Sequence, residues 1–123
     1  MSYPKLFTAG ILATLLGVVF VVAANAQDPV QVDPSHYKVL FENSHVRVLS
    51  VHYGPHETGP EHSHPNSVIV YLSDAHVKYT RPNGKSGEWN AKKGDARWAP
   101  ADKHKIQNVD DGPYEAVLIE LKH

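Results

Sequence analysis

The sequence contains no cysteine, which excludes both a disulfide framework and a lipid-anchored lipoprotein. It also has little excess of either charge, because 12 Lys and Arg residues stand against 13 Asp and Glu residues. Without a basic stripe, we expect no nucleic acid among its partners. A third absence is helical periodicity, since no segment repeats apolar residues at the spacing of an amphipathic helix. Because disulfides are absent, the stability of the fold must come from packing, from a bound metal or from oligomerisation.

The long apolar run of the sequence lies at its N-terminus. Lys5 is followed by residues 6–24, which carry no charge, and Ala24-Asn25-Ala26 has the small-x-small pattern that a signal peptidase reads. We predict that residues 1–26 are a secretory signal peptide, so that the chain is secreted or periplasmic and keeps no stable membrane span after processing. The alternative is an uncleaved anchor, because about 19 apolar residues can span a bilayer.

Removing the first 26 residues from 123 leaves 97, which is enough for one domain. Residues 27–37 are polar and contain two prolines, so they are predicted to be an N-terminal linker or arm. Residues 38–123 are predicted to form the domain itself. All nine histidines lie after residue 26, and histidine is the commonest metal ligand. A histidine-rich surface would give the same count, so the number alone does not define a site.

After residue 37, short β-branched and aromatic segments alternate with turns rich in Gly, Pro and Asn. Asn83-Gly84 marks a hairpin, because both residues of the tightest hairpin turn need positive φ. Strands spaced roughly 8 to 12 residues apart predict an all-β sandwich or barrel, and a jelly roll suits a domain this small. The predicted strands are 38–41, 46–53, 67–72, 76–80, 88–90, 96–99, 104–109 and 114–121.

The chemistry of the sequence centres on His62-Ser63-His64. Alternate residues of a strand share a face, so both imidazoles would point the same way and could chelate one metal. A surface pair is the alternative, because a His-x-His pattern alone is weak. A third ligand must come from another strand, and His104 begins an alternating segment that a closed barrel can bring opposite the pair. We predict a metal site of His62, His64 and His104.

On these residues the chain resembles the cupins. His62-Ser63-His64-Pro65 followed by residues 68–72 is similar to the first cupin motif, and Gly94, Pro100, His104 and Asn108 are spaced like the second. The resemblance covers residues 39–121 and is strongest to small cupins of the β-alanine degradation type. It implies a double-stranded β-helix, the cupin jelly-roll barrel, with one divalent metal inside it. It also implies that the chain can form a homodimer.

The sequence departs from the cupin pattern at three places. Val68 stands where the family has a glutamate ligand, and Ala75 and Asp102 replace two turn glycines. Three neutral imidazoles leave the charge of a divalent ion uncompensated, so the site would favour a small anionic or chelating ligand. Open coordination positions are typical of catalytic metal sites. Imidazole ligands suit Fe, Zn, Mn, Cu or Ni, so the identity of the metal stays open.

Other residues are weaker candidates for the site. Glu57 and Glu61 precede the His-x-His pair and are candidate general bases, or solvated loop residues. Asn108 is a candidate partner for the second ring nitrogen of a ligand, or a turn residue. Trp98 and Tyr71 are candidate pocket residues, although aromatic side chains in strands are more often core.

Two functions fit the sequence. The first is a metal-dependent enzyme, either an oxygenase, as in the iron cupins that use dioxygen, or a zinc hydrolase with an activated water. The second is a non-catalytic periplasmic protein that binds a metal or a small ligand. Open coordination positions favour the enzyme. Arg97 is either an anion-binding group for that enzyme or a solvated strand residue.

Overall fold

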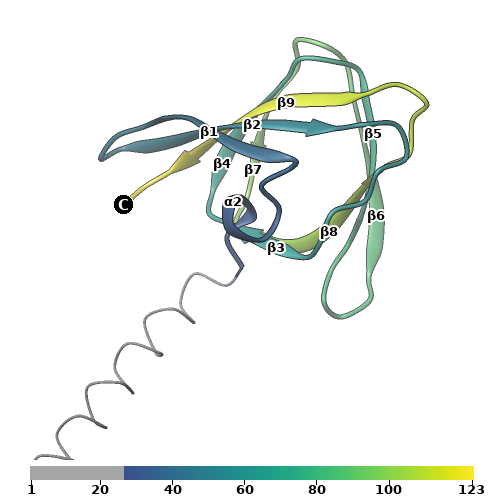
Figure 1. The fold of residues 1–123 in the computed structure, drawn as a ribbon, viewed down its shortest axis with the longest axis horizontal. Helices are drawn as coiled ribbons and strands as arrows, with labels where there is room; N and C mark the ends of the chain where they lie inside the picture. Colours follow the sequence, from purple (N-terminus) through teal and green to yellow (C-terminus); the bar gives the residue numbers. More distant parts are fainter. Residues whose placement is uncertain (1–26) are drawn as a thin grey trace, which may run out of the picture.

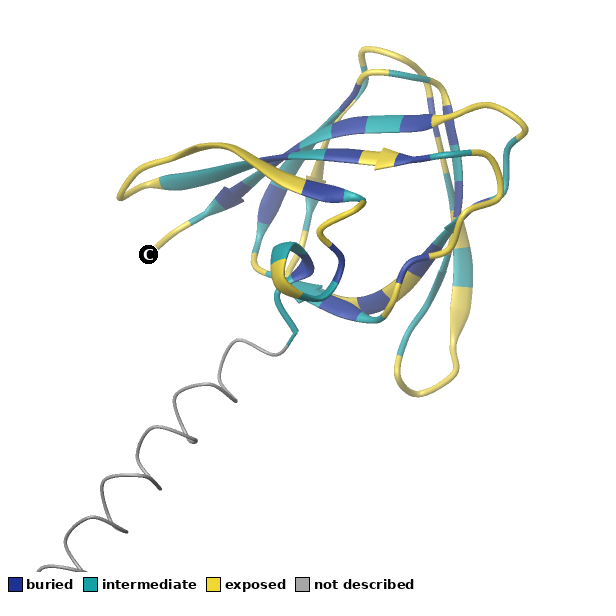
Figure 2. Ribbon diagram, in the orientation of Figure 1, coloured by how far each residue is buried: buried dark blue, intermediate teal, exposed yellow. Residues whose placement is uncertain are grey.

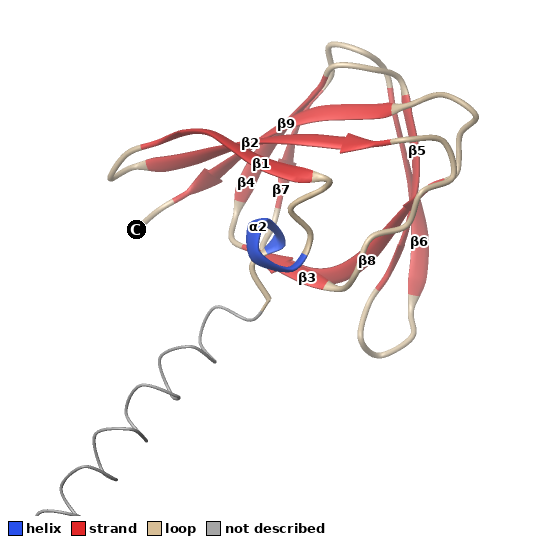
Figure 3. Cartoon of the chain, in the orientation of Figure 1, coloured by secondary structure: helices blue, strands red, loops and turns tan. Residues whose placement is uncertain are grey.

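The computed structural model of this protein describes residues 27–123, and the predicted signal peptide lies outside the described residues. Within this range, none of the helices has the length and apolar character needed to cross a membrane. The described chain folds into two antiparallel sheets that face each other around a cavity (Figure 1; Figure 3).

Nine strands of the described chain form the two sheets. They are β1 (Tyr37–Glu42), β2 (Val46–Tyr53), β3 (His62–His64), β4 (Ser67–Tyr71), β5 (Ala75–Thr80), β6 (Ser86–Ala91), β7 (Ala96–Ala99), β8 (Asp102–Asn108) and β9 (Tyr114–Leu121). The five-stranded sheet has the order β1-β2-β9-β4-β7, and the four-stranded sheet has the order β3-β8-β5-β6. The prediction of an all-β double-stranded β-helix is confirmed.

Alternation along the strands explains why they face one another. In β9, Tyr114, Ala116 and Leu118 are buried between the sheets, while the residues between them are half-buried (Figure 2). A period of two is the period of a strand with one covered face. The boundaries of β2, β7 and β9 agree with the sequence prediction. The strand β8 begins at Asp102 instead of His104, because Asp102 pairs with His64 of β3.

The hairpin between β5 and β6 lies where Asn83-Gly84 predicts it. Its turn differs from the expected one, because of these two residues only Gly84 has a positive φ, of 86°. The loop is closed by the Arg81 N–H, which donates to the Lys85 carbonyl, and by the Gly84 N–H, which donates to the Arg81 carbonyl. The loop is therefore longer than a two-residue turn, and a single left-handed glycine is enough for it.

The segment 27–37 was expected to be a polar linker or arm, and it is an ordered arm. It contains a short helix, α2 (Pro29–Val32), whose N-cap Asp28 accepts a hydrogen bond from the Val30 N–H. The Arg47 guanidinium donates to both carboxylate oxygens of Asp28 at 2.9 Å and to Glu120 at 2.7 Å. These ion pairs hold the arm against the barrel. They join residues that are far apart in the sequence, so the sequence alone does not predict them.

The outer face of the five-stranded sheet carries an apolar row that crosses all five strands. Residues directly opposite one another in neighbouring strands share a face, and this row consists of Phe41, Val48, Ile119, Val68 and Trp98. Its two ends are open, since Phe41 is 55% exposed and Trp98 is 56% exposed. The inner face instead packs Leu49, Leu118 and their neighbours into the core.

Candidate metal centre

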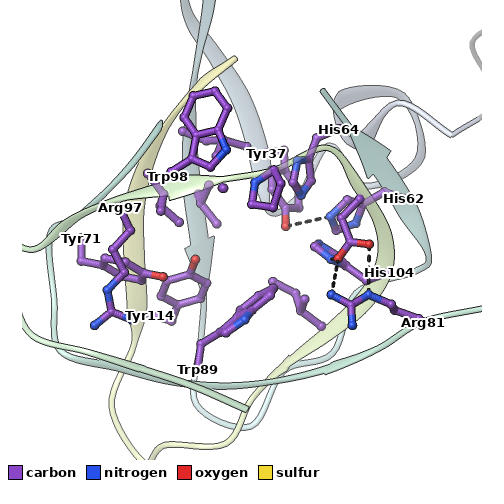
Figure 4. A pocket seen from close by; sticks show the side chains of 17 residues that line it. Tyr37, His62, His64, Tyr71, Arg81, Trp89, Arg97, Trp98, His104 and Tyr114 are labelled. Atoms are coloured by element: carbon purple, nitrogen blue, oxygen red, sulfur yellow. Dashed lines mark hydrogen bonds and ion pairs between the residues drawn. The ribbon is translucent and has the colours of Figure 1, made fainter. Parts of the chain in front are cut away.

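Strand pairing brings the three predicted ligands together. The short strand β3 runs antiparallel to β8, with His62 directly opposite His104. His64 lies two residues further along β3, so its side chain leaves the strand on the same face as His62. All three rings therefore lie on the wall that the four-stranded sheet contributes to the cavity (Figure 4).

Ring spacing gives a test of whether this triad fits a metal. The centroid of His104 lies 5.0 Å from the centroid of His62 and 5.0 Å from that of His64, and the latter two are 6.2 Å apart. A metal–nitrogen bond of about 2.1 Å puts an ion roughly 3.3 Å from a centroid, so tetrahedral ligands have centroids about 5.4 Å apart and octahedral neighbours about 4.7 Å apart. Both pairs that include His104 fall within this range.

The remaining pair is wider than a metal would hold it. In residues 27–123, no group of three or more His, Cys, Asp or Glu side chains already has its donor atoms at coordinating positions. We attribute this to the 6.2 Å between His62 and His64, which a bound ion would shorten by about 1 Å. The backbone register of β3 and β8 does not need to change, since ring rotations are enough.

Each of the three rings is held from behind by an acceptor. Nδ1 of His62 lies 3.3 Å from the carbonyl of Pro60, and Nδ1 of His64 lies 3.2 Å from the carbonyl of Pro65. Nδ1 of His104 lies 3.0 Å from a carboxylate oxygen of Asp102. These oxygens can only accept, so every Nδ1 carries the proton and donates it. Nε2 is therefore the unprotonated nitrogen of every ring, as in metal-binding histidines whose other nitrogen donates to a protein group, and at His62 it lies 3.4 Å from the Tyr37 hydroxyl.

Burial favours the neutral form of His62 and His104. Desolvation, with a smaller contribution from the neighbouring His104, lowers the pKa of His62 to about 4. The pKa of His104 is also lowered by burial, against the opposing effect of its hydrogen bond to Asp102. At neutral pH these two imidazoles are therefore uncharged.

Asp102 has a larger part in the site than its place in a turn suggested. Burial raises the pKa of its carboxyl, but hydrogen bonds from Arg81 and His104 outweigh burial and lower it. Arg81 donates Nε and Nη2 to the two carboxylate oxygens at 3.1 Å and 3.3 Å. Asp102 is thus a fixed anion that orients His104. The signal was in the sequence, because an Asp-x-His in a strand puts both side chains on one face.

A cavity of about 190 Å³ lies in front of the triad. Trp89 on β6 packs its edge against His104, with ring centroids 5.4 Å apart. The Tyr37 hydroxyl lies 3.4 Å from Nε2 of His62 and 3.1 Å from the Tyr53 hydroxyl. Tyr37 comes from the end of the predicted arm, and no sequence pattern places it beside His62. The cavity is smaller than a site for a drug-sized molecule.

Comparison with solved structures identifies this arrangement of sheets. A cupin domain from Bordetella pertussis Tohama I superposes with a TM-score of 0.66 at 24% identity, over 71% of this chain and 92% of its own. The fold is a cupin double-stranded β-helix. A double-stranded β-helix protein from Klebsiella pneumoniae gives a TM-score of 0.55 at 24% identity, over 69% of this chain and 74% of its own.

The same cupin fold occurs in oxalate decarboxylase from Bacillus subtilis. It superposes with a TM-score of 0.51 at 23% identity over 64% of this chain, which corresponds to 22% of that enzyme. No protein-family model and no curated protein sequence matches the chain. The likeness therefore establishes the fold and leaves function to be argued from the residues of the cavity.

Two predicted candidates for a general base do not reach the cupin cavity. Glu57 lies on an exposed loop, where its carboxylate accepts from the Gly54 N–H and faces His36. Glu61 is next to His62 but points away from it and pairs with Lys103. Neither lines the cavity. Alternation along the strand explains Glu61, because neighbours of an inward residue point outward.

Asn108 is fully buried but does not contact the triad. Its amide group donates to the carbonyls of Gly54 and Gly112, at 3.0 Å and 2.9 Å, and its side-chain oxygen accepts from the Asp110 N–H. Asn108 therefore joins two loops at the end of the barrel. The predicted role beside a metal ligand is replaced by a role in loop structure.

Of the predicted pocket residues, Tyr71 lies deep in the cavity and Trp98 borders it while remaining largely exposed. The position of the missing cupin glutamate also becomes clear. Val68 belongs to the outer apolar row, opposite Trp98, whereas its neighbour Ile69 lines the cavity. At this point the wall opposite the triad thus presents the apolar Ile69 to the cavity, and the described residues place no glutamate there.

Proposed function

We propose that this chain is a metal-dependent cupin enzyme that holds one divalent transition metal with His62, His64 and His104. The observation that carries the proposal is the set of three hydrogen bonds from Nδ1, which leaves Nε2 as the unprotonated nitrogen of all three rings at one cavity. A histidine cluster without function has no need of three matched tautomers. The spacing of the rings supports the same conclusion.

The residues around the triad favour oxygenase chemistry over hydrolysis. A zinc hydrolase needs a base beside its bound water. Among the residues described, the carboxylate that lines the cavity is Asp102, which is already engaged by Arg81 and His104. A redox-active ion such as iron would supply the chemistry by binding an anionic substrate and reducing dioxygen. The protein would contribute orientation, through Tyr37, and exclusion of water, through the apolar walls.

Oxygen uptake by metal-loaded protein tests this function. Purified protein would be loaded anaerobically with Fe²⁺, the bound iron counted, and oxygen consumption followed with thiols, β-diketones and flavonols. We expect stoichiometric iron and uptake with one of these classes. Stoichiometric iron with no uptake would instead indicate a periplasmic protein that binds a metal or small ligand without turnover. Absence of bound iron, zinc, copper, nickel and manganese would refute the metal site itself.

We also propose that the chain is exported and processed after Ala26. The supporting observation is the apolar run of residues 6–24 that ends in Ala24-Asn25-Ala26. Intact-mass analysis of protein from the periplasm should give a chain that begins at Gln27. Recovery of the full-length chain from the membrane fraction would favour the uncleaved anchor.

A homodimer through the outer apolar row is the proposed assembly. The strands lie about 4.8 Å apart, so the outer apolar row and the two rows that flank it on the same face cover roughly 450 Å² of sheet. This is about half of what one partner buries in a standard interface. The row is symmetric about its central strand β9, with Phe41 at one end and Trp98 at the other, so a two-fold axis matches it to itself. Light scattering should give twice the chain mass, and Val68→Lys should give a monomer.

A further inference from the structure

The wall opposite the triad carries polar groups that the metal site does not use. Tyr71 on β4 and Tyr114 on β9 are 4% and 3% exposed, and both line the cavity from the five-stranded sheet. Figure 4 shows their hydroxyl groups turned toward the interior of the cavity. Within residues 27–123, neither hydroxyl forms a hydrogen bond, whereas the hydroxyls of Tyr37 and Tyr53 bind each other.

Both hydroxyls are open to the cavity, since neither is among the fully buried side-chain atoms that lack a partner in the described residues. A molecule in the cavity can therefore reach both of them. Burial raises the pKa of Tyr71 and raises that of Tyr114 well above its ordinary value, so both hydroxyls keep their protons and act as donors. A molecule that satisfies them must therefore offer an oxygen lone pair.

A positive charge stands at the same end of the cavity. The Arg97 guanidinium lies over the Tyr71 ring, 5.6 Å from its centroid, and also lines the cavity. One of its nitrogens binds Asp95 at 3.2 Å, which offsets part of its charge and leaves other N–H groups free. Between this end and the triad the walls are apolar, with Val51, Ile69 and Leu118.

We propose that Tyr71, Tyr114 and Arg97 bind the carboxylate tail of a small bifunctional substrate whose other end binds at the histidine triad. The proposal rests on the proposed function and adds to it the class of substrate: a short chain with an anionic group at each end and an apolar middle. One end of the substrate would bind at the imidazoles of the four-stranded sheet, and the other would accept hydrogen bonds from the donors of the five-stranded sheet. The cavity of about 190 Å³ limits the chain to a few carbons.

Matched pairs of acids test the proposal on Zn²⁺-loaded protein, because zinc permits binding without redox turnover. Calorimetry would compare succinate with butanoate and glutarate with pentanoate, in wild type and in a Tyr71→Phe/Tyr114→Phe variant. The dicarboxylate of the better length should bind about 10-fold more tightly or better than its monocarboxylate, as expected for hydrogen bonds to a charged group. The double variant should lose this preference and keep its affinity for Zn²⁺ and for the monocarboxylate.

A control variant and an experiment on metal-free protein distinguish this inference from the metal site. Tyr79→Phe removes a hydroxyl that does not line the cavity, so it should leave the preference intact. Normal Zn²⁺ binding with no dicarboxylate preference, or a preference that survives in the double variant, would overturn the proposal and leave the metal site standing. If Zn²⁺ itself does not bind, glutarate binding to the metal-free wild type that is lost in the double variant would support the tyrosines alone, and its absence would refute them.

Discussion

The two walls of the cavity differ in the polar groups that they present and in whether those groups already have hydrogen-bond partners. The wall from the four-stranded sheet presents lone pairs, and each of its three imidazoles is fixed from behind by an oxygen acceptor. The wall from the five-stranded sheet presents donors, and the hydroxyls of Tyr71 and Tyr114 have no partner within the described chain. The first wall is organised before any ligand arrives, while the second is completed by its ligand. A cation on one side and an anion on the other would satisfy both.

The largest effect on this difference between the walls is expected from removal of one imidazole of the triad. His104→Ala should abolish binding of a divalent metal, because it deletes the ligand that is close to both partners. Calorimetric titration with Zn²⁺ or Co²⁺ measures the effect. His76→Ala is the matched control, since His76 pairs with the exposed Glu88 away from the cavity, and it should bind metal normally. Stoichiometric metal in His104→Ala would show that the ligand set is wrong.

Weakening the support of a ligand should have a smaller effect than deleting it. Asp102→Asn removes the charge that orients His104 and leaves Arg81 without its partner. Loss of such a partner typically costs about 10- to 100-fold in metal affinity. The measurement is a competition titration against a chelator. Asp111→Asn, which removes a fully exposed carboxylate beside His56, should leave affinity unchanged; equal losses in the two variants would point to a general charge effect.

Sequence reasoning reached the first wall more easily than the second. The pairing of His62 with His64 follows from alternation within three residues, although 62–64 is not among the predicted strands. His104 is indicated both by the geometry of a closed barrel and by the cupin spacing. Tyr37 lies beside His62 only because the arm folds back onto the barrel, and sequence patterns do not encode that docking. The family spacing indicates Val68, whereas Ile69 is the residue that lines the cavity, because the inward position depends on which face of β4 is covered. Asp102 was accessible to the same alternation argument that identified the histidines.

Exchanging the character of the second wall tests it directly. Ile69→Glu places a carboxylate opposite the triad, close to where cupins have their fourth ligand. We expect Zn²⁺ to bind roughly 10-fold more tightly, because the added anion compensates the charge of the ion. Glutarate should no longer bind, because a like charge now occupies its path. Val68→Glu is the matched control on the outer face, where neither effect should occur; an unchanged titration for Ile69→Glu would mean that this position does not face the ion.

The smallest expected effect is on the stability of the arm, residues 27–37, which ends at Tyr37 beside His62. Burial raises the pKa of Asp28, but hydrogen bonds from Arg47 and from the Val30 N–H outweigh it, so the folded-state pKa lies below the ordinary value of 3.8. A depressed carboxyl pKa adds stability that is present above 3.8 and is lost as the pH falls below it, because the unfolded chain then binds the proton more readily.

Asp28→Asn should therefore cost about 1 kcal/mol at neutral pH, since Asn keeps the helix cap but loses the charge. Urea unfolding at a series of pH values measures the difference between the two proteins. That difference should shrink toward zero as the pH falls through the carboxyl pKa, while the Zn²⁺ affinity at neutral pH stays within about 2-fold of wild type, because α2 contacts the barrel but supplies no ligand. A difference that is constant with pH would assign the stabilisation to packing of the arm and not to the Asp28–Arg47 ion pair.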